Sequence, residues 1–202
     1  TCTPYLVGNK PQLGEHVAWA ESSAVSYANS VLGARTNREG GPSAMAAAIT
    51  GRTAAYGLHL EEARRASLQV EVHCPVKTLS DFGALGYLVG KRAQNRIPYF
   101  VGDELGLDAC TDAHLKALGA AMAASGAVAL YHVAGVTPEA DRPDILVPTY
   151  ETFAVRDLAP AYAALNTAAR EIDLVWFGCP HASLAEIRRV AELLKGRAVT
   201  AA

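Results

Sequence analysis

Strand-like and helix-like segments alternate along this chain of 202 residues, and that alternation most limits the fold. Strands are expected at residues 67–73, 97–101, 127–133 and 173–177. Segment 67–73, SLQVEVH, alternates apolar and polar residues as a half-buried strand does. Segments 127–133 and 173–177 are nearly all apolar, which is typical of strands covered on both faces. The pattern predicts βαβ units and hence an α/β fold, a mostly parallel sheet flanked by helices.

Helices are predicted around and between these strands, at residues 16–32, 44–50, 81–93, 112–124, 157–170 and 183–195. Ser80 and Asp112 are the expected N-caps of the third and fourth helices. The third helix contains GALGYLVG, which is not the GxGxxG fingerprint and does not lie in a strand-to-helix turn. We therefore interpret its glycines as permitting close helix packing.

Composition limits the class of protein. Half of the residues are apolar, 19% are charged and the formal net charge is -2, so the chain is neither disordered nor a basic nucleic-acid binder. We expect no nucleic-acid or membrane partner, since no apolar run reaches the roughly 18 residues of a span. The four cysteines form no CxxC pair, which favours reduced thiols in the cytoplasm. The absence of an initial Met and the final AVTAA indicate a segment truncated at both ends.

A polar loop bounded by glycines contains the first candidate site. Residues 35–39, RTNRE, lie between Gly33 and Gly40. Arg can hold a carboxylate or a phosphate through two parallel hydrogen bonds, so such a loop suits a small anion. The candidate substrate-binding residues are Arg35, Thr36, Asn37 and Arg38, with Glu21 and Ser22 on the preceding helix. The alternatives are a solvated loop between helices and, for Glu21 and Ser22, helix-local hydrogen bonding.

The cysteines form the second candidate site. Cys179, in GCPH, follows the predicted strand 173–177 and precedes a helix, and ligands usually bind at that edge of an α/β sheet. A nearby helix N-terminus favours the thiolate that a metal or a nucleophilic mechanism needs. Cys2, in CTPY, and Cys74, before Pro75, are further candidates, and we regard Cys110 as a bystander. The alternative for Cys179 is a small buried residue in a turn.

The turn-rich segment 135–149 is a candidate active-site loop. It contains Pro138, Pro143 and Pro148, and structureless loops of this length are commonly functional.

Several of these strings together resemble the aconitase X family over nearly the whole chain. The most specific are GARTNREGG and FGCPHASLAEI, supported by PYLVGNKPQLGEHVAWAESSAV and LKALGAAMAASGAVALYHVAGVTPEA. The resemblance implies a hydro-lyase whose aconitase-like large domain works with a smaller swivelling domain. It also implies iron, either mononuclear or in a 2Fe-2S or 4Fe-4S cluster. Bacterial members dehydrate cis-3-hydroxy-L-proline, and archaeal members dehydrate mevalonate 5-phosphate.

Carried over to this chain, the resemblance assigns Cys2 and Cys179 as iron ligands. It implies that residues 1–202 are a segment of the large domain. A third cysteine, the small domain or subunit and the general base would then lie elsewhere, so the segment alone is expected to be inactive. Arg35 or Arg38 would stabilise charge at the substrate carboxylate. The Ala- and Gly-rich composition favours cis-3-hydroxy-L-proline as substrate; the alternatives are mevalonate 5-phosphate and a folded fragment without metal.

Overall fold

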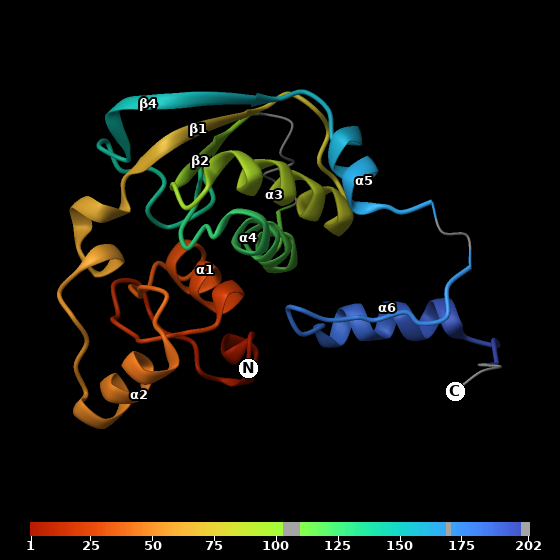
Figure 1. The fold of residues 1–202 in the computed structure, drawn as a ribbon, viewed down its shortest axis with the longest axis horizontal. Coiled ribbons are helices and arrows are strands. Elements are labelled where there is room, and N and C mark those ends of the chain that lie inside the picture. Colours follow the sequence, from red (N-terminus) through yellow and green to blue (C-terminus); the bar gives the residue numbers. More distant parts are fainter. Residues whose placement is uncertain (103–109, 169–170, 199–202) are drawn as a thin grey trace.

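A four-stranded parallel sheet forms the centre of the fold (Figure 1). The computed structural model describes residues 1–102, 110–168 and 171–198. The strands are β1 (Ala66–Val72), β2 (Pro98–Val101), β3 (His132–Val133) and β4 (Leu146–Val155), in the order β3-β2-β1-β4. Every neighbouring pair is parallel, which confirms the predicted α/β class.

Helices α3 (Leu79–Ala93) and α4 (Asp112–Gly126) lie side by side against the sheet, and α1 (Ser22–Ser30) packs on α4 (Figure 1). Along β1, Leu68, Val70 and Val72 are buried while their neighbours are half-buried, so one face of the strand points into the core. The remaining helices are α2 (Gly41–Thr50), α5 (Ala159–Leu165) and α6 (Leu184–Leu194), with 3-10 turns at Pro4–Val7, Gly57–His59 and Glu61–Arg64. None of the helices in the described ranges is long and apolar enough to cross a membrane.

Glycines allow α3 and α4 to approach closely, as predicted. A Cβ atom at Gly86 would lie 2.6 Å from the carbonyl oxygen of Leu118, and one at Gly90 would lie 3.0 Å from Cα of Met122. A Cβ atom at Gly83 would have no other atom within 4 Å. The packing interpretation is therefore confirmed at Gly86 and Gly90, and Gly83 lies off the contact.

Both of these helices have their N-cap earlier in the sequence than predicted, by two residues in α3 and by one in α4. Thr78 caps α3 and Thr111 caps α4, each in a reciprocal capping box with the third helical residue. Ser80 and Asp112, the predicted N-caps, are instead first-turn residues. The hydroxyls of Thr78 and Thr111 accept hydrogen bonds from the backbone N–H groups of Asp81 and His114. The threonine side chains therefore fix where the two helices start.

Two predicted elements are shorter than expected. The helix predicted from residue 16 begins only at Ser22, because residues 16–20 run alongside the polar loop: Glu39 donates its N–H to the carbonyl of Trp19. The strand predicted at 127–133 is reduced to β3, because Ala127 ends α4 in the left-handed conformation with a φ of 60°. In the first segment, backbone pairing with the polar loop replaces the helix that the local sequence favours. In the second, the end of α4 takes up the first residue of the predicted strand.

Three predictions near the C-terminal third need correction. Segment 135–149 is not only a loop, because β4 begins inside it; Pro148 is tolerated there since β4 is an edge strand. Segment 173–177 is unpaired and exposed rather than a buried strand, with Trp176 82% exposed. The helix predicted at 157–170 is α5, which ends before Asn166, and residues 169–170 lie outside the described residues.

Candidate functional site

The N-terminal segment and the loop before α6 meet in space. The backbone N–H of His181 donates to Sγ of Cys2 at 3.0 Å, and Oγ1 of Thr1 lies 3.2 Å from Nδ1 of His181. Cys2 is buried, whereas Cys179, two residues before His181, is exposed. The fold therefore brings together the two segments that carry the predicted metal-ligating cysteines, although nearly the whole chain separates them.

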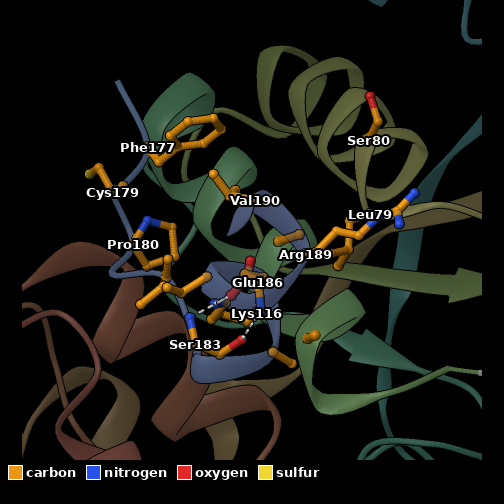
Figure 2. Close-up of a pocket in the computed structure, with 16 residues that line it drawn as sticks. Leu79, Ser80, Lys116, Phe177, Cys179, Pro180, Ser183, Glu186, Arg189 and Val190 are labelled. Carbon is orange, nitrogen blue, oxygen red and sulfur yellow. Dashed lines mark hydrogen bonds and ion pairs between the residues drawn. The ribbon is translucent and has the colours of Figure 1, made fainter. Parts of the chain in front are cut away.

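A buried lysine fixes this loop against the body of the protein. Nζ of Lys116, on α4, lies 2.6 Å from Oε2 of Glu186 and donates to the carbonyl of His181 at 3.3 Å. Glu186 also accepts the N–H of Ser183 at 2.7 Å, which caps α6 (Figure 2). Burial opposes ionisation of Glu186, but hydrogen bonds from Lys116 and Ser183 prevail and lower its pKa. Sequence reasoning missed Lys116, because a lysine in an Ala-rich helix gives no sign of burial.

A pocket of about 760 Å³ lies between α6, the start of α3 and the first turns of α4. Since α3 and α4 follow β1 and β2, it lies on the side of the carboxyl ends of the strands, where ligands bind in α/β sheets. Figure 2 shows Lys116, Glu186 and Ser183 grouped together, with Phe177 and Cys179 at the edge. Cys179 has a φ of 52°, rare for a residue with a Cβ atom and often found at functional sites.

A buried tyrosine lies beside Cys2. The ring of Tyr5 stacks on Tyr27 with centroids 3.8 Å apart, and its hydroxyl has no hydrogen-bond partner among the described residues. Burial raises the pKa of Tyr5 strongly, and the nearby Tyr27, Cys2 and Glu21 raise it further, so the hydroxyl keeps its proton. Sequence reasoning did not single out Tyr5; its position three residues after Cys2 is the signal that was available.

Glu21 and Ser22 lie at the start of α1. Glu21 is the N-cap: its Oε2 accepts the N–H of Ala24 at 2.8 Å and the hydroxyl of Ser23 at 2.7 Å. Ser22, which is half-buried, is the first residue of the helix. The alternative of helix-local hydrogen bonding therefore describes Glu21 in this structure.

Most polar groups of the glycine-bounded loop contact the protein itself. Arg35 pairs with Glu61 and donates to the carbonyl of His59, and Thr36 is fully buried, with its N–H on Oδ1 of Asn29. Asn37 donates to the carbonyl of Tyr56 and accepts from the N–H of Leu58.

Arg38 differs from these three residues. It is exposed and makes no hydrogen bond or ion pair with any described residue. It lines a second pocket of about 300 Å³ together with Ala63, Ile97 and Leu130, which precede β1, β2 and β3. That pocket, which Asn37 also lines, lies at the amino ends of the strands, whereas Glu21 lines a separate pocket with Thr1 and Pro4, on either side of Cys2 in the sequence.

The described residues do not complete a metal centre by themselves. No three His, Cys, Asp or Glu side chains within residues 1–102, 110–168 and 171–198 come together as a metal site. Cys74 is part of the apolar core, and burial raises the pKa of Cys110 to about 11, which makes it a poor thiolate donor. Cys2 and Cys179 remain the candidate thiol ligands, and a full ligand set would need donors from outside the described residues.

Two family models match the first four-fifths of the chain, up to residue 163. The model of the aconitase X first domain matches residues 1–62, and that of the second domain matches residues 66–163. The chain belongs to the aconitase X family. A solved structure, the holo-form of Thermococcus kodakaraensis aconitase X, superposes with a TM-score of 0.84 at 49% sequence identity; the match covers 96% of this chain and 50% of that one.

Curated relatives in the aconitase X family carry two different names. The phosphomevalonate dehydratase large subunit of Methanothermobacter thermautotrophicus is 58% identical over 96% of this chain and 48% of that one. The phosphomevalonate dehydratase large subunit of Methanosarcina mazei is 54% identical over 99% of this chain and 49% of that one. The cis-3-hydroxy-L-proline dehydratase of Pseudomonas aeruginosa is 40% identical over 98% of this chain and 35% of that one. This chain thus spans about half the length of the phosphomevalonate dehydratase chains that it matches.

Proposed function

We propose that this chain forms part of the large subunit of a phosphomevalonate dehydratase, a hydro-lyase that removes water from mevalonate 5-phosphate. The observation that supports the proposal is the identity of 51–58% to four large subunits of that name, against 40–42% to two cis-3-hydroxy-L-proline dehydratases, although a fifth large subunit is 39% identical. The composition had favoured cis-3-hydroxy-L-proline. The comparisons support mevalonate 5-phosphate, the alternative, better. The composition was a poor guide, because Ala and Gly content depends on helix packing and not on the ligand.

Mevalonate 5-phosphate carries a carboxylate and a phosphate, so its site needs cations and backbone N–H groups. Arg38 is exposed and makes no ion pair within the described residues, so its guanidinium is open to an anionic group in the pocket at the amino ends of the strands, and not in the pocket beside Cys179. Arg35 would position the loop instead, since Glu61 already holds its guanidinium. The N-termini of α3 and α4 beside the larger pocket offer a second place for negative charge.

Cys2 and Cys179 are proposed to supply thiols to the reaction site. The contact between Cys2 and His181 supports this role, because it holds the loop of Cys179 next to the N-terminal segment. Tyr5, which keeps its proton beside Cys2, would present a hydroxyl donor there. The described residues do not form a complete metal site, so we assign no step of the reaction to a metal.

The name large subunit in the relatives implies a small-subunit partner. We propose that this chain acts with such a subunit and with the half of the large chain that it does not match. The 202 residues alone are expected to be inactive. The small-molecule substrate and the small subunit are then the two partners of the assembled enzyme.

Two chimeras test the substrate. In the first, residues 1–202 replace the matched part of the Methanothermobacter thermautotrophicus large subunit, co-expressed with its small subunit. In the second, they replace the matched part of the Pseudomonas aeruginosa enzyme. We expect the first to dehydrate mevalonate 5-phosphate within about tenfold of its parent in kcat/KM, and the second to lose most activity on cis-3-hydroxy-L-proline. The reverse pattern would favour cis-3-hydroxy-L-proline as substrate.

A further inference from the structure

The segment before α6 exposes five large apolar side chains within six residues, interrupted by Asp173. Ile172, Leu174, Val175, Trp176 and Phe177 are each between 61% and 82% exposed. Contiguous exposed apolar surface of this kind is uncommon on a monomeric soluble protein and indicates a surface that is covered by another chain or segment. Residues 174–177 are consecutive apolar residues rather than alternating ones, so side chains on both sides of the extended segment are exposed.

Helix α6 continues the same surface. Leu184, Ile187 and Leu193 are between 54% and 62% exposed, and no residue of α6 is buried. Figure 1 shows the segment before α6 running alongside the helix, away from the four-stranded sheet. The loop between them is held to the body by Lys116 and Cys2, so this surface has a fixed place on the molecule.

Strand, turn and helix in this order form half of a βαβ unit. A consecutive apolar run directly before a capped helix is typical of a central strand in a parallel sheet, buried on both faces. Within the described residues, segment 172–177 pairs with no strand, because the sheet contains only β1 to β4. The sequence pattern predicts a buried strand, whereas the structure has this segment exposed and unpaired. Both are explained if the neighbouring strands come from another part of the protein.

We propose that residues 172–177 become a central strand of a second sheet, with neighbouring strands supplied by the half of the aconitase X large chain that these 202 residues do not match. The relatives support this occupant, since this chain covers 48–50% of the large chains that it resembles. The match to the solved structure covers 96% of this chain and so includes most of residues 171–198. Strand addition satisfies backbone hydrogen bonds and buries both apolar faces. The proposal depends on family membership and not on the substrate.

Hydrogen exchange tests this placement. The samples are the 202-residue chain and the first chimera, the latter with and without the Methanothermobacter thermautotrophicus small subunit. We expect the amides of 172–177 to exchange at least about a hundredfold more slowly in the chimeric large chain alone than in the 202-residue chain. Equal exchange in both would overturn the proposal. Protection that appears only after the small subunit is added, or protection in the 202-residue chain that rises with its concentration, would assign the surface to the small subunit or to a second copy and would also overturn it.

A matched pair of substitutions tests the apolar face in the same chimera. Leu174→Asp introduces a charge on the proposed strand, and Ile49→Asp introduces it on α2, where Ile49 is equally exposed at 78% against 75%. We expect Leu174→Asp to remove the protection of 172–177 and Ile49→Asp to leave it within about twofold. Full protection in both variants would show that the side chain of Leu174 does not enter an apolar core, and this would overturn the proposed burial of both faces of the strand. Substrate turnover is not needed for either readout, so failure here is distinct from failure of the proposed reaction.

Discussion

Arg64 and Glu139 form a buried ion pair that joins the two matched family segments. Nε of Arg64 lies 2.9 Å from both carboxylate oxygens of Glu139, and its NH2 group contacts the same carboxylate. The guanidinium also donates to the carbonyl of Leu58 and to the side chain and carbonyl of Asn29. Arg64 is fully buried and falls between residues 1–62 and 66–163, so it fixes the first segment on the second.

Removing Arg64 should destabilise the protein strongly. Arg64→Met deletes every contact of the guanidinium and leaves the buried carboxylate of Glu139 with only Arg142, at 3.9 Å, as a cationic partner. Breaking a buried pair in this way costs about 3–5 kcal/mol in the free energy of unfolding. Urea denaturation should show that loss, whereas Arg189→Ala, at a pair 70% exposed, should change stability by less than about 0.5 kcal/mol. Comparable losses in the two variants would refute a special role for Arg64.

The stability should also depend on the protonation of His132. Burial lowers the pKa of His132 to about 4, while its Nε2 contacts the carbonyl of Arg64 at 2.9 Å. The folded state thus keeps the ring neutral, whereas the unfolded state binds a proton below about pH 6.5. Unfolding therefore becomes easier as the pH falls from about 6.5 towards 4, by up to about 3 kcal/mol.

His132→Asn isolates this effect from other titrating groups. His59, whose pKa burial and His16 also lower, titrates in the same direction and stays present in both proteins. Stability curves between pH 4 and 7 should be flatter for the variant than for the unaltered chain. Parallel curves would mean that His132 titrates normally in the folded state.

Two glycines of α3 should respond oppositely to alanine. Gly86→Ala places a Cβ atom 2.6 Å from the carbonyl oxygen of Leu118 and should cost about 1–3 kcal/mol by overpacking. Gly83→Ala, on the same helix, meets nothing within 4 Å and should stabilise by about 0.5–1 kcal/mol, because alanine has less unfolded-state entropy. Thermal unfolding of both variants decides. Stabilisation by Gly86→Ala would show that the two helices can move apart without cost.

Lys116 should control access to Cys2. Lys116→Met removes the ion pair with Glu186 and the contact with His181, so the loop that covers the Cys2 thiol is released more often. We expect a thiol reagent to modify Cys2 at least about tenfold faster, measured for each cysteine by mass spectrometry. Arg189→Met is the control, since Arg189 lines the same pocket but is exposed. An unchanged Cys2 rate would mean that other contacts hold the loop.

The sequence predicted the elements with strong local signals. Segment 67–73 alternates apolar and polar residues, and it is β1; Gly51 and Ser183 bound helices as expected. β4 was missed, because prolines at 143 and 148 suggest a loop and only the sheet order shows that an edge strand tolerates one. Segment 173–177 has the pattern of a buried strand, yet burial depends on neighbours that the pattern cannot supply.

The site was less predictable than the fold. Sequence motifs indicated Cys2 and Cys179, and the structure brings their segments together through His181. The sequence could not indicate Lys116, Tyr5 or Arg64, because their importance comes from burial and from partners distant in sequence. The same limit applies to the glycine-bounded loop, where the internal contacts of Arg35 and Asn37 exist only in the folded chain.

The most direct measurement replaces the two cysteines, one at a time, in the first chimera. Cys2→Ser and Cys179→Ser should each lower kcat/KM for mevalonate 5-phosphate by at least about a hundredfold with little change in melting temperature, since each thiol is proposed to act at the reaction site. Cys110→Ser, at a thiol whose pKa burial raises to about 11, should stay within about twofold. Near-parental kinetics in both Cys2→Ser and Cys179→Ser would contradict the central claim that these two segments form the active site.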